Sequence, residues 1–316
     1  MEEIAHILFL SRPDLNQDMS LRQLRQLCQK SGAQLTLLEV LEPVSQNLFM
    51  SEKVLASQLE SKLIEHAETN LKLIAEDFIQ AGVKTDTVVV KGKPVIEVLR
   101  QVNELSVDLL MLNAESESNL KQRIFGSTAL HLIRKCPCPV WAIKSTCYYP
   151  MRNIMGAVDL NPDDDDRQRS NLNPDIARTT VMLADLLGTP AHLVQAWKLD
   201  NEAHLQTRGG LDDRTLERLH RDMQRHYESR MANFCTNVLS EQQTKIKTHV
   251  VHGTPAHVVA QQTDYHNIDL LVMGTLSRQG ILGMLIGNTA EDILNSVDCS
   301  VLALKPPGFV CPVKSD

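Results

Sequence analysis

GKPVIEVLRQVNELSVDLLMLN, residues 92–113, returns in altered form as GTPAHVVAQQTDYHNIDLLVMG at residues 253–274. Seven positions are identical at a constant offset of 161 residues: Gly92 and Gly253, Pro94 and Pro255, Val98 and Val259, Gln101 and Gln262, Asp108 and Asp269, Leu109 and Leu270, and Leu110 and Leu271. The same offset relates four later pairs: Gly126 and Gly287, Thr128 and Thr289, Cys138 and Cys299, and Lys144 and Lys305. One register held over so long a stretch without a gap indicates an internal duplication.

The two copies divide the 316 residues near the middle. Towards the start of each copy the offset falls, to 156 at Gly32 and Gly188 and to about 148 at the opening strands, so the second copy has gained residues. The acidic segment NPDDDDRQRS, residues 161–170, supplies them. Pro150 breaks regular structure between the copies. The sequence therefore predicts two domains, residues 1–147 and 151–316.

Each copy alternates short apolar runs with segments of helical periodicity. The predicted strands are residues 7–10, 35–40, 87–90, 109–112 and 140–143, then 154–158, 192–196, 247–251, 270–273 and 301–304. The clearest predicted helix runs from Ser51 to Ala81, with apolar residues at helical spacing. Apolar strands separated by helices indicate an α/β fold in which each copy is a five-stranded parallel sheet with helices on both faces.

The composition excludes several classes of function. The net charge is -7, whereas binding to nucleic acid or to anionic membranes needs a basic surface. Aromatic residues make up 4% of the chain, too few for a base-stacking platform, and no apolar run approaches the roughly 20 residues of a membrane span. The acidic start MEEIAHILFL does not resemble a secretion signal, so we expect a cytoplasmic protein whose seven cysteines are reduced.

Several distinctive residues of the second copy follow predicted strands. Asp159 follows its first strand, Gly253 its third and Gly274 its fourth, and Gly287-Asn288-Thr289 begins a helix, where Thr289 and Asp292 suggest a weak capping box. Ligands of parallel sheets bind beyond the carboxyl ends of the strands, and a helix N-terminus favours a phosphate. The alternative is that the glycines are turn residues and that Asn288 and Thr289 only cap the helix.

MGTLSRQGILGMLIGNTAEDIL, residues 273–294, resembles the signature of the universal stress protein family. The signature has a glycine, two residues, a second glycine, nine residues, and then a glycine with a small polar residue. Gly274, Gly287 and Asn288 match it, whereas Ser277 stands at the second glycine. The segments 253–255, 269–274 and 300–305 are also similar to the family. The resemblance implies two tandem flavodoxin-like (adenine nucleotide alpha hydrolase-like) domains.

The resemblance also implies a ligand, ATP or a related nucleotide with Mg²⁺, in the second copy. The positions carried over are Asp159 and Ala196 at the adenine, Met273, Gly274 and Ser277 along the ribose and phosphate path, and Gly287, Asn288 and Thr289 at the phosphates. Arg278 could neutralise phosphate charge. Ser277 adds a side chain where the backbone should approach the phosphate, although its hydroxyl could donate a hydrogen bond.

The first copy departs further from the nucleotide-binding pattern. Ser11 is aligned with the carboxylate, Asn113 replaces the first glycine, and Glu115 and Glu117 bring negative charge to the place of a triphosphate. Only the run 126–128 survives at the helix start. We therefore expect the first copy to be structural or to hold a different ligand.

No dedicated catalytic constellation is evident in the sequence. It contains no glycine-flanked serine elbow, Walker lysine or plausible triad order. The resemblance implies survival under stress, including DNA-damaging conditions, through ligand sensing and contact with an unknown protein partner. It also implies an intrachain pseudo-dimer that pairs through residues 140–143 and 301–304, with a further homodimer possible. The alternatives are a weak ATPase, an interaction protein with vestigial sites, and a binder of another phosphorylated or partly apolar molecule.

Metal sites are not expected from the sequence. The acidic run 163–166 lacks the spacing of a calcium loop, and Cys136 and Cys138 near His131 lack usual zinc-ligand spacing. His249 and His252 are three apart on a strand and point to opposite faces. Those histidines, with His204, His220 and His226, are expected to be packed or exposed, and a metal site among them is the alternative.

Overall fold

All ten predicted strands are present, and each lies within one or two residues of its predicted bounds. The computed structural model describes residues 3–43, 50–114, 125–146, 148–160, 172–199, 212–240, 245–275, 286–306 and 308–309. The first copy contains β1 (His6–Leu10), α1 (Asp18–Ser31), β2 (Gln34–Leu41), α2 (Met50–Gln80), β3 (Thr85–Lys91), α3 (Pro94–Glu104), β4 (Leu109–Asn113), α4 (Ser127–Lys135) and β5 (Val140–Ile143). The second contains β6 (Ile154–Ala157), α5 (Asn173–Leu187), β7 (Ala191–Trp197), α7 (Asp213–Leu239), β8 (Ile246–His252), α8 (Pro255–Tyr265), β9 (Leu270–Gly274), α9 (Asn288–Ser296) and β10 (Ser300–Leu304).

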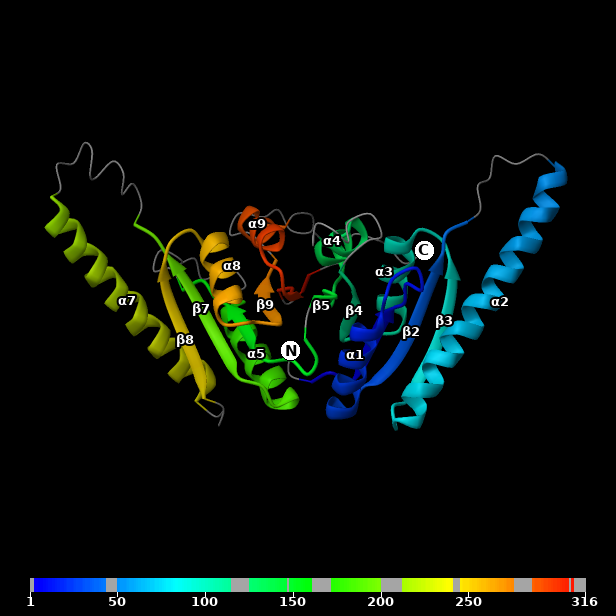
Figure 1. The fold of residues 1–316 in the computed structure, drawn as a ribbon, viewed down its shortest axis with the longest axis horizontal. Helices are drawn as coiled ribbons and strands as arrows, with labels where there is room; N and C mark the ends of the chain where they lie inside the picture. The colour runs from blue at the N-terminus through cyan, green and yellow to red at the C-terminus, as the bar shows by residue number, and fades with distance from the viewer. Residues whose placement is uncertain are drawn as a thin grey trace.

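One ten-stranded sheet runs through both copies, in the order β3-β2-β1-β4-β5-β10-β9-β6-β7-β8. Within each copy all neighbouring strands are parallel. β5 and β10 are antiparallel and join the copies, with Trp141 opposite Leu302. Figure 1 shows the resulting two-fold pseudosymmetry, with β5 and β9 near the middle and α2 and α7 at the outer ends. The predicted pairing of the copies through their last strands is confirmed.

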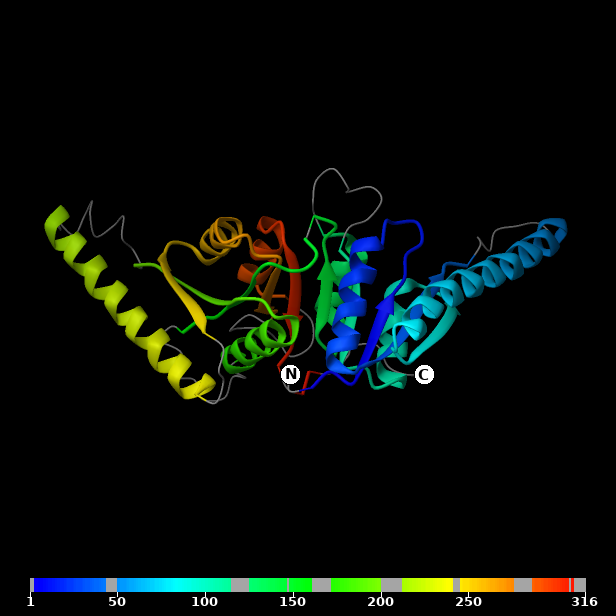
Figure 2. The same ribbon diagram turned by 60° about the horizontal axis from the view of Figure 1, so that its bottom comes forward.

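Helices cover both faces of this sheet, as predicted. One continuous core lies under α1, α2, α5 and α7, and α1 contacts α5 across the middle of the molecule (Figure 2). The second core lies under α3, α4, α8 and α9. Both cores contain residues of both copies, so the two copies pack against each other and share their hydrophobic cores. Among the described helices, none is long and apolar enough to cross a bilayer.

Gly156 shows where the copies differ in packing. It lies in β6, at the position that fully buried Phe9 occupies in β1. A Cβ at Gly156 would lie 2.5 Å from Thr180 Oγ1 and 2.9 Å from Leu193 Cδ2. In the second copy these neighbours fill the space that an aromatic ring fills in the first.

Replacing Gly156 with valine is therefore expected to destabilise the protein by about 2 kcal/mol, because the added methyl groups overpack a filled core. The urea midpoint of unfolding measures the change. Thr248→Val, at an exposed position of β8, is the control and should leave the midpoint unchanged. An unchanged midpoint for Gly156→Val would show that the core beside β6 has slack.

Candidate functional site

The candidate site is the crevice at the carboxyl ends of β6 and β9, which we call the second-copy crevice. The chain proceeds from β6 to β7 on one side of β6, whereas β9 lies on its other side, so strand order reverses here. Such a reversal opens a crevice in a parallel sheet. Asp159 lies two residues beyond β6, and Gly274 is the last residue of β9. Because β6 and β9 are parallel neighbours, Asp159 and Gly274 lie at the same end of the sheet.

Two amides hold the segment that carries Asp159. The Asp159 N–H donates to Asn173 Oδ1 at 2.9 Å, and Asn173 Nδ2 donates to the Asp159 carbonyl at 2.7 Å. The next residue, Leu160, donates its N–H to Gln195 Oε1 at 2.6 Å. These bonds fix the main chain, while the Asp159 residue is exposed at the mouth of the crevice. Sequence reasoning missed Asn173 because it lies beyond the long insertion of this copy.

The start of α9 lies beside the end of β9. The Gly287 N–H donates to the Thr275 carbonyl at 3.0 Å, which ties the helix start to the residue after Gly274. Gly287 is the N-cap, and no side chain caps it within the described residues. The capping box predicted at Thr289 and Asp292 is therefore wrong, because Thr289 already lies inside the helix. Asn288 and Thr289 are exposed, and the first N–H groups of a helix have no partner within it, so this turn can bind an anion.

Lys305 places a cation behind this turn. Its Nζ donates to Thr275 Oγ1 at 2.9 Å and to the Arg134 carbonyl at 3.1 Å. Burial lowers the pKa of Lys305 to about 8, so the amine is mostly protonated at neutral pH. The sequence showed that Lys305 repeats Lys144, but gave it no role at the site. The structure adds its charge to the positive end of α9.

The remaining predicted site residues of the second copy differ in burial and in their distance from the crevice. Met273 is buried, and Ala196 is half-buried in β7, next to β6. Gly253 directly follows β8, which is separated from β6 by β7. Its φ of +145° would be strained with a side chain, so its local role is in a turn. Leu172 packs closely against Gly274, since a Cβ added at Gly274 would lie 2.9 Å from Leu172 Cδ1. Gly274 thus has a packing role as well as its place at the crevice.

Several predicted residues lie outside the described part of the chain. They are Ser277, Arg278, Glu115, Glu117, His204 and the acidic run 163–166.

The corresponding strand ends of the first copy carry different side chains. The Ser11 N–H donates to the Leu38 carbonyl, and the Val158 N–H donates in the same way to the Val194 carbonyl. Ser11 and Val158 are therefore equivalent, and the next residue in the first copy, Arg12, is the counterpart of Asp159. The alignment of Ser11 with the carboxylate is therefore wrong by one residue. Arg12 pairs with Asp14, and a cation replaces the anion.

Polar side chains also occupy the place of Gly274 in the first copy. Asn113, which replaces Gly274, accepts a hydrogen bond from Ser20 Oγ. The cavity that remains between Leu10, Arg12, Asn113 and Thr128 measures about 20 Å³, room for about one water molecule. The helix start is nevertheless preserved, because Gly126 at the N-cap of α4 has φ -64° and ψ 157°, close to the -66° and 146° of Gly287. The copies share the backbone conformation of this helix start and differ in the residues at the neighbouring strand ends.

A family model for the universal stress protein family matches residues 16–144 and again residues 151–305. The chain belongs to the universal stress protein family. Both matches fall on the two copies found by self-comparison, so the duplication and the family resemblance are confirmed together.

Relatives of this universal stress protein span both copies. It is 28% identical to universal stress protein E of Photorhabdus laumondii over 248 residues, which cover 78% of this chain and 76% of that protein. The identity to universal stress protein E of Escherichia coli K12 is also 28%, over 77% of this chain and 75% of the other.

Among solved structures, a functionally unknown protein of Pseudomonas aeruginosa superposes with a TM-score of 0.72 at 19% identity, over 98% of this chain and 95% of the other. A universal stress protein of Archaeoglobus fulgidus superposes with a TM-score of 0.64 at 16% identity, over 95% and 98%. These likenesses confirm the tandem α/β fold.

Cys136, Cys138 and His131 of this universal stress protein have different surroundings. Cys136 and Cys138 are buried free thiols with their sulfurs 3.4 Å apart, whereas His131 is exposed. Burial raises the pKa of the Cys136 thiol, which disfavours the thiolate that zinc requires. His249 contacts His192, whereas His252 contacts Trp197 and His220, so these two histidines have separate neighbours.

Proposed function

We propose that this protein supports survival under stress, including DNA-damaging conditions, by binding ATP, a related nucleotide or another phosphorylated ligand in the second-copy crevice. In this proposal residues 151–316 form the ligand-binding domain and residues 1–147 its structural partner. The observation that carries it is the difference between the copies. In the second copy Asp159 follows β6, next to β9, whose end is bonded to the helix start at Gly287, whereas in the first copy Arg12 and Asn113 take the places of Asp159 and Gly274.

The residues of the crevice suit the two ends of a nucleotide. The uncapped start of α9, with Lys305 behind it, favours phosphate oxygens. Asp159, exposed beyond the neighbouring strand, can accept hydrogen bonds from an adenine amino group or a ribose hydroxyl. Ala196 offers an apolar surface on the next strand for the base. When bound, Mg²⁺ would neutralise part of the charge of a triphosphate.

Asp159→Ala is expected to weaken ATP binding about ten-fold or more, because it removes a charged hydrogen-bond acceptor from the crevice. Calorimetric titration of the full chain with ATP and Mg²⁺ measures the affinity. Since the bonds that hold the segment use the main chain of Asp159, the fold should be unaffected.

Arg12→Ala is the matched control, because Arg12 is the counterpart of Asp159 in the first copy. It should leave the affinity unchanged. Equal effects of the two substitutions would contradict the assignment of the ligand to the second copy. Absence of nucleotide binding at millimolar concentration would instead favour an interaction protein with vestigial sites.

The weak ATPase is the enzyme alternative. Tight binding with negligible phosphate release supports a sensor, whereas steady release that disappears in Asp159→Ala supports an ATPase. Sensing is the leading proposal because the sequence contains no serine elbow, Walker lysine or plausible triad order. The free thiols Cys136 and Cys138, close together and unbonded, fit a reducing compartment such as the cytoplasm. A protein partner and a further homodimer belong to the same proposal.

A further inference from the structure

Three histidines of the second copy meet away from the crevice, towards the amino ends of the strands. His192 is the second residue of β7, His249 lies in the middle of β8, and His266 directly follows α8. One ring nitrogen from each lies within 4.8 Å of those of the other two. His192 Nδ1 and His249 Nε2 are 2.9 Å apart, and the rings of His249 and His266 have centroids 4.1 Å apart. We call these residues the histidine cluster.

We propose that the histidine cluster binds one Zn²⁺ ion through three imidazole nitrogens, with the fourth position open to water or to an exogenous ligand. Three imidazoles and one open position form a recurrent zinc site. With Zn–N distances of about 2.0 Å, tetrahedral ligands stand about 3.3 Å apart, so nitrogens up to 4.8 Å apart in the cluster need to approach by about 1.5 Å at most. His249 and His266 are only partly buried and can rotate to allow this.

A buried nitrogen without a partner supports this proposal. His192 is 2% exposed, and its Nε2 has no hydrogen-bond partner among the described residues. A buried polar atom left in this way destabilises a fold, and such exceptions call for an explanation. The His192 ring thus bonds His249 through Nδ1 and has a second, buried nitrogen that no described residue satisfies.

The charge state of the rings is also compatible with a metal ion. His192 is buried and His249 and His266 are partly buried, and burial disfavours the charged imidazolium. Neutral imidazole is the form that binds a metal. Lys247 is the one nearby cation among the described residues that affects these rings, and it is exposed, so water screens its repulsion of the ion.

The first copy shows that the fold does not require these histidines. The strand registers align His192 with Thr36 and His249 with Val88, and the duplication aligns His266 with Leu105. There a single ring, His6, bonds Thr36 Oγ1 at 2.9 Å and the Leu105 carbonyl at 3.2 Å, so both its nitrogens have partners. Its counterpart Asn153 bonds the His266 carbonyl in the second copy. The same place is thus saturated in one copy and presents three imidazoles in the other.

The test is Zn²⁺ binding to the full, tag-free chain after treatment with a chelator. Equilibrium dialysis should find one Zn²⁺ per chain at micromolar or tighter affinity, and X-ray absorption should show about three imidazole ligands. His266→Gln should weaken binding at least ten-fold, and because His266 lies at a partly exposed helix end, this variant should fold normally. His249→Gln should have a similar effect.

His257→Gln is the matched control, since His257 is an exposed histidine on the same helix, α8, and should leave the affinity unchanged. Binding that survives in His249→Gln and His266→Gln would overturn the proposal. Loss of binding in Cys136→Ser with retention in both histidine variants would overturn it in favour of a thiolate site. ATP titration is an independent readout, so failure here leaves the nucleotide proposal standing.

Discussion

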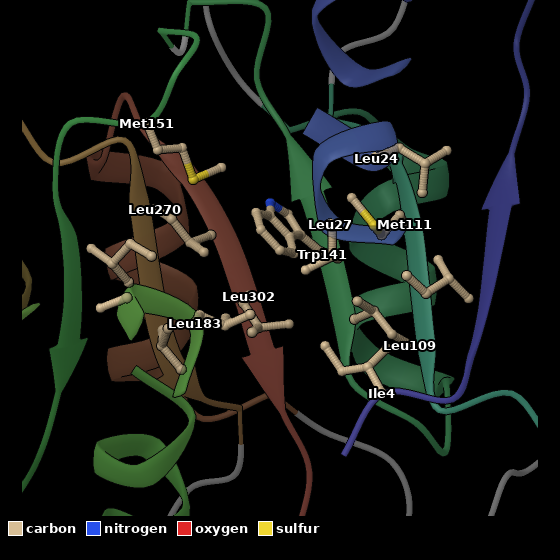
Figure 3. Packing of buried hydrophobic residues seen from close by; sticks show 14 of the residues in the cluster. Ile4, Leu24, Leu27, Leu109, Met111, Trp141, Met151, Leu183, Leu270 and Leu302 are labelled. Atoms are coloured by element: carbon tan, nitrogen blue, oxygen red, sulfur yellow. The ribbon is translucent and has the colours of Figure 1, made fainter. Parts of the chain in front are cut away.

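Trp141→Ala is expected to lower the free energy of unfolding by about 4 kcal/mol, because it removes the largest side chain at the junction of the two copies. Trp141 is 1% exposed and lies opposite Leu302 on the antiparallel pair β5 and β10. Figure 3 shows its ring between Leu302 and Met151 of the second copy and Leu27 and Met111 of the first. The lost packing and the cavity therefore fall on both copies. Urea unfolding measures the loss.

Trp141→Phe separates packing from hydrogen bonding at this position. The Trp141 Nε1 is buried without a hydrogen-bond partner among the described residues, so phenylalanine removes an unpaired donor while keeping most of the apolar area. The expected cost is below about 1.5 kcal/mol. If Trp141→Ala and Trp141→Phe were equally mild, the β5–β10 junction would contribute little to stability. Two separated unfolding transitions in the alanine variant would show that the junction couples the copies.

The duplication made the fold predictable from the sequence. Short apolar runs such as 35–40 and 301–304 are ambiguous singly, but each has a counterpart, and a strand supported in both copies is hard to mistake. Fully buried parallel strands also read as unbroken apolar runs, so their bounds were close. The pairing of β5 with β10 was not in the pattern of either copy and came from the family resemblance alone, and its antiparallel direction is known from the structure.

The candidate site was less predictable because it depends on registers and on contacts between distant segments. The opening strands of the two copies are not connected to the repeat by a gap-free stretch, so the sequence alignment was wrong there by one residue. It paired Asp159 with Ser11, whereas the structure pairs it with Arg12. Asn173 follows an insertion with no counterpart in the first copy. The histidine cluster takes one residue from each of β7, β8 and the end of α8, so no spacing in the sequence signals it. Lys305 was visible as a repeated residue, but its contact with the other copy was not.

A buried carboxylate at the amino end of β9 underlies the second large expected effect. Asp269 is 1% exposed and accepts hydrogen bonds from the Arg152 main-chain N–H at 2.7 Å and from its guanidinium at 2.8 and 3.1 Å. The guanidinium also lies over the Tyr148 ring at 3.7 Å. Asp269→Ala removes the acceptor that anchors the chain as it enters β6, and we expect it to lower the free energy of unfolding by about 3 kcal/mol. Urea unfolding again measures the loss.

The duplication provides the comparison for Asp269. Within the described part of the chain, its counterpart Asp108 accepts bonds from main-chain N–H groups only, those of Ala5 and His6 at 3.0 and 2.9 Å, and it is half-buried. Asp108→Ala should therefore cost less, about 1 to 2 kcal/mol, since no guanidinium loses its partner. In a double-mutant cycle, Arg152→Ala and Asp269→Ala should couple, because either change alone breaks the ion pair. Equal costs at Asp108 and Asp269 would show that the guanidinium adds nothing and that the conserved geometry of strand entry, common to both copies, accounts for the whole effect.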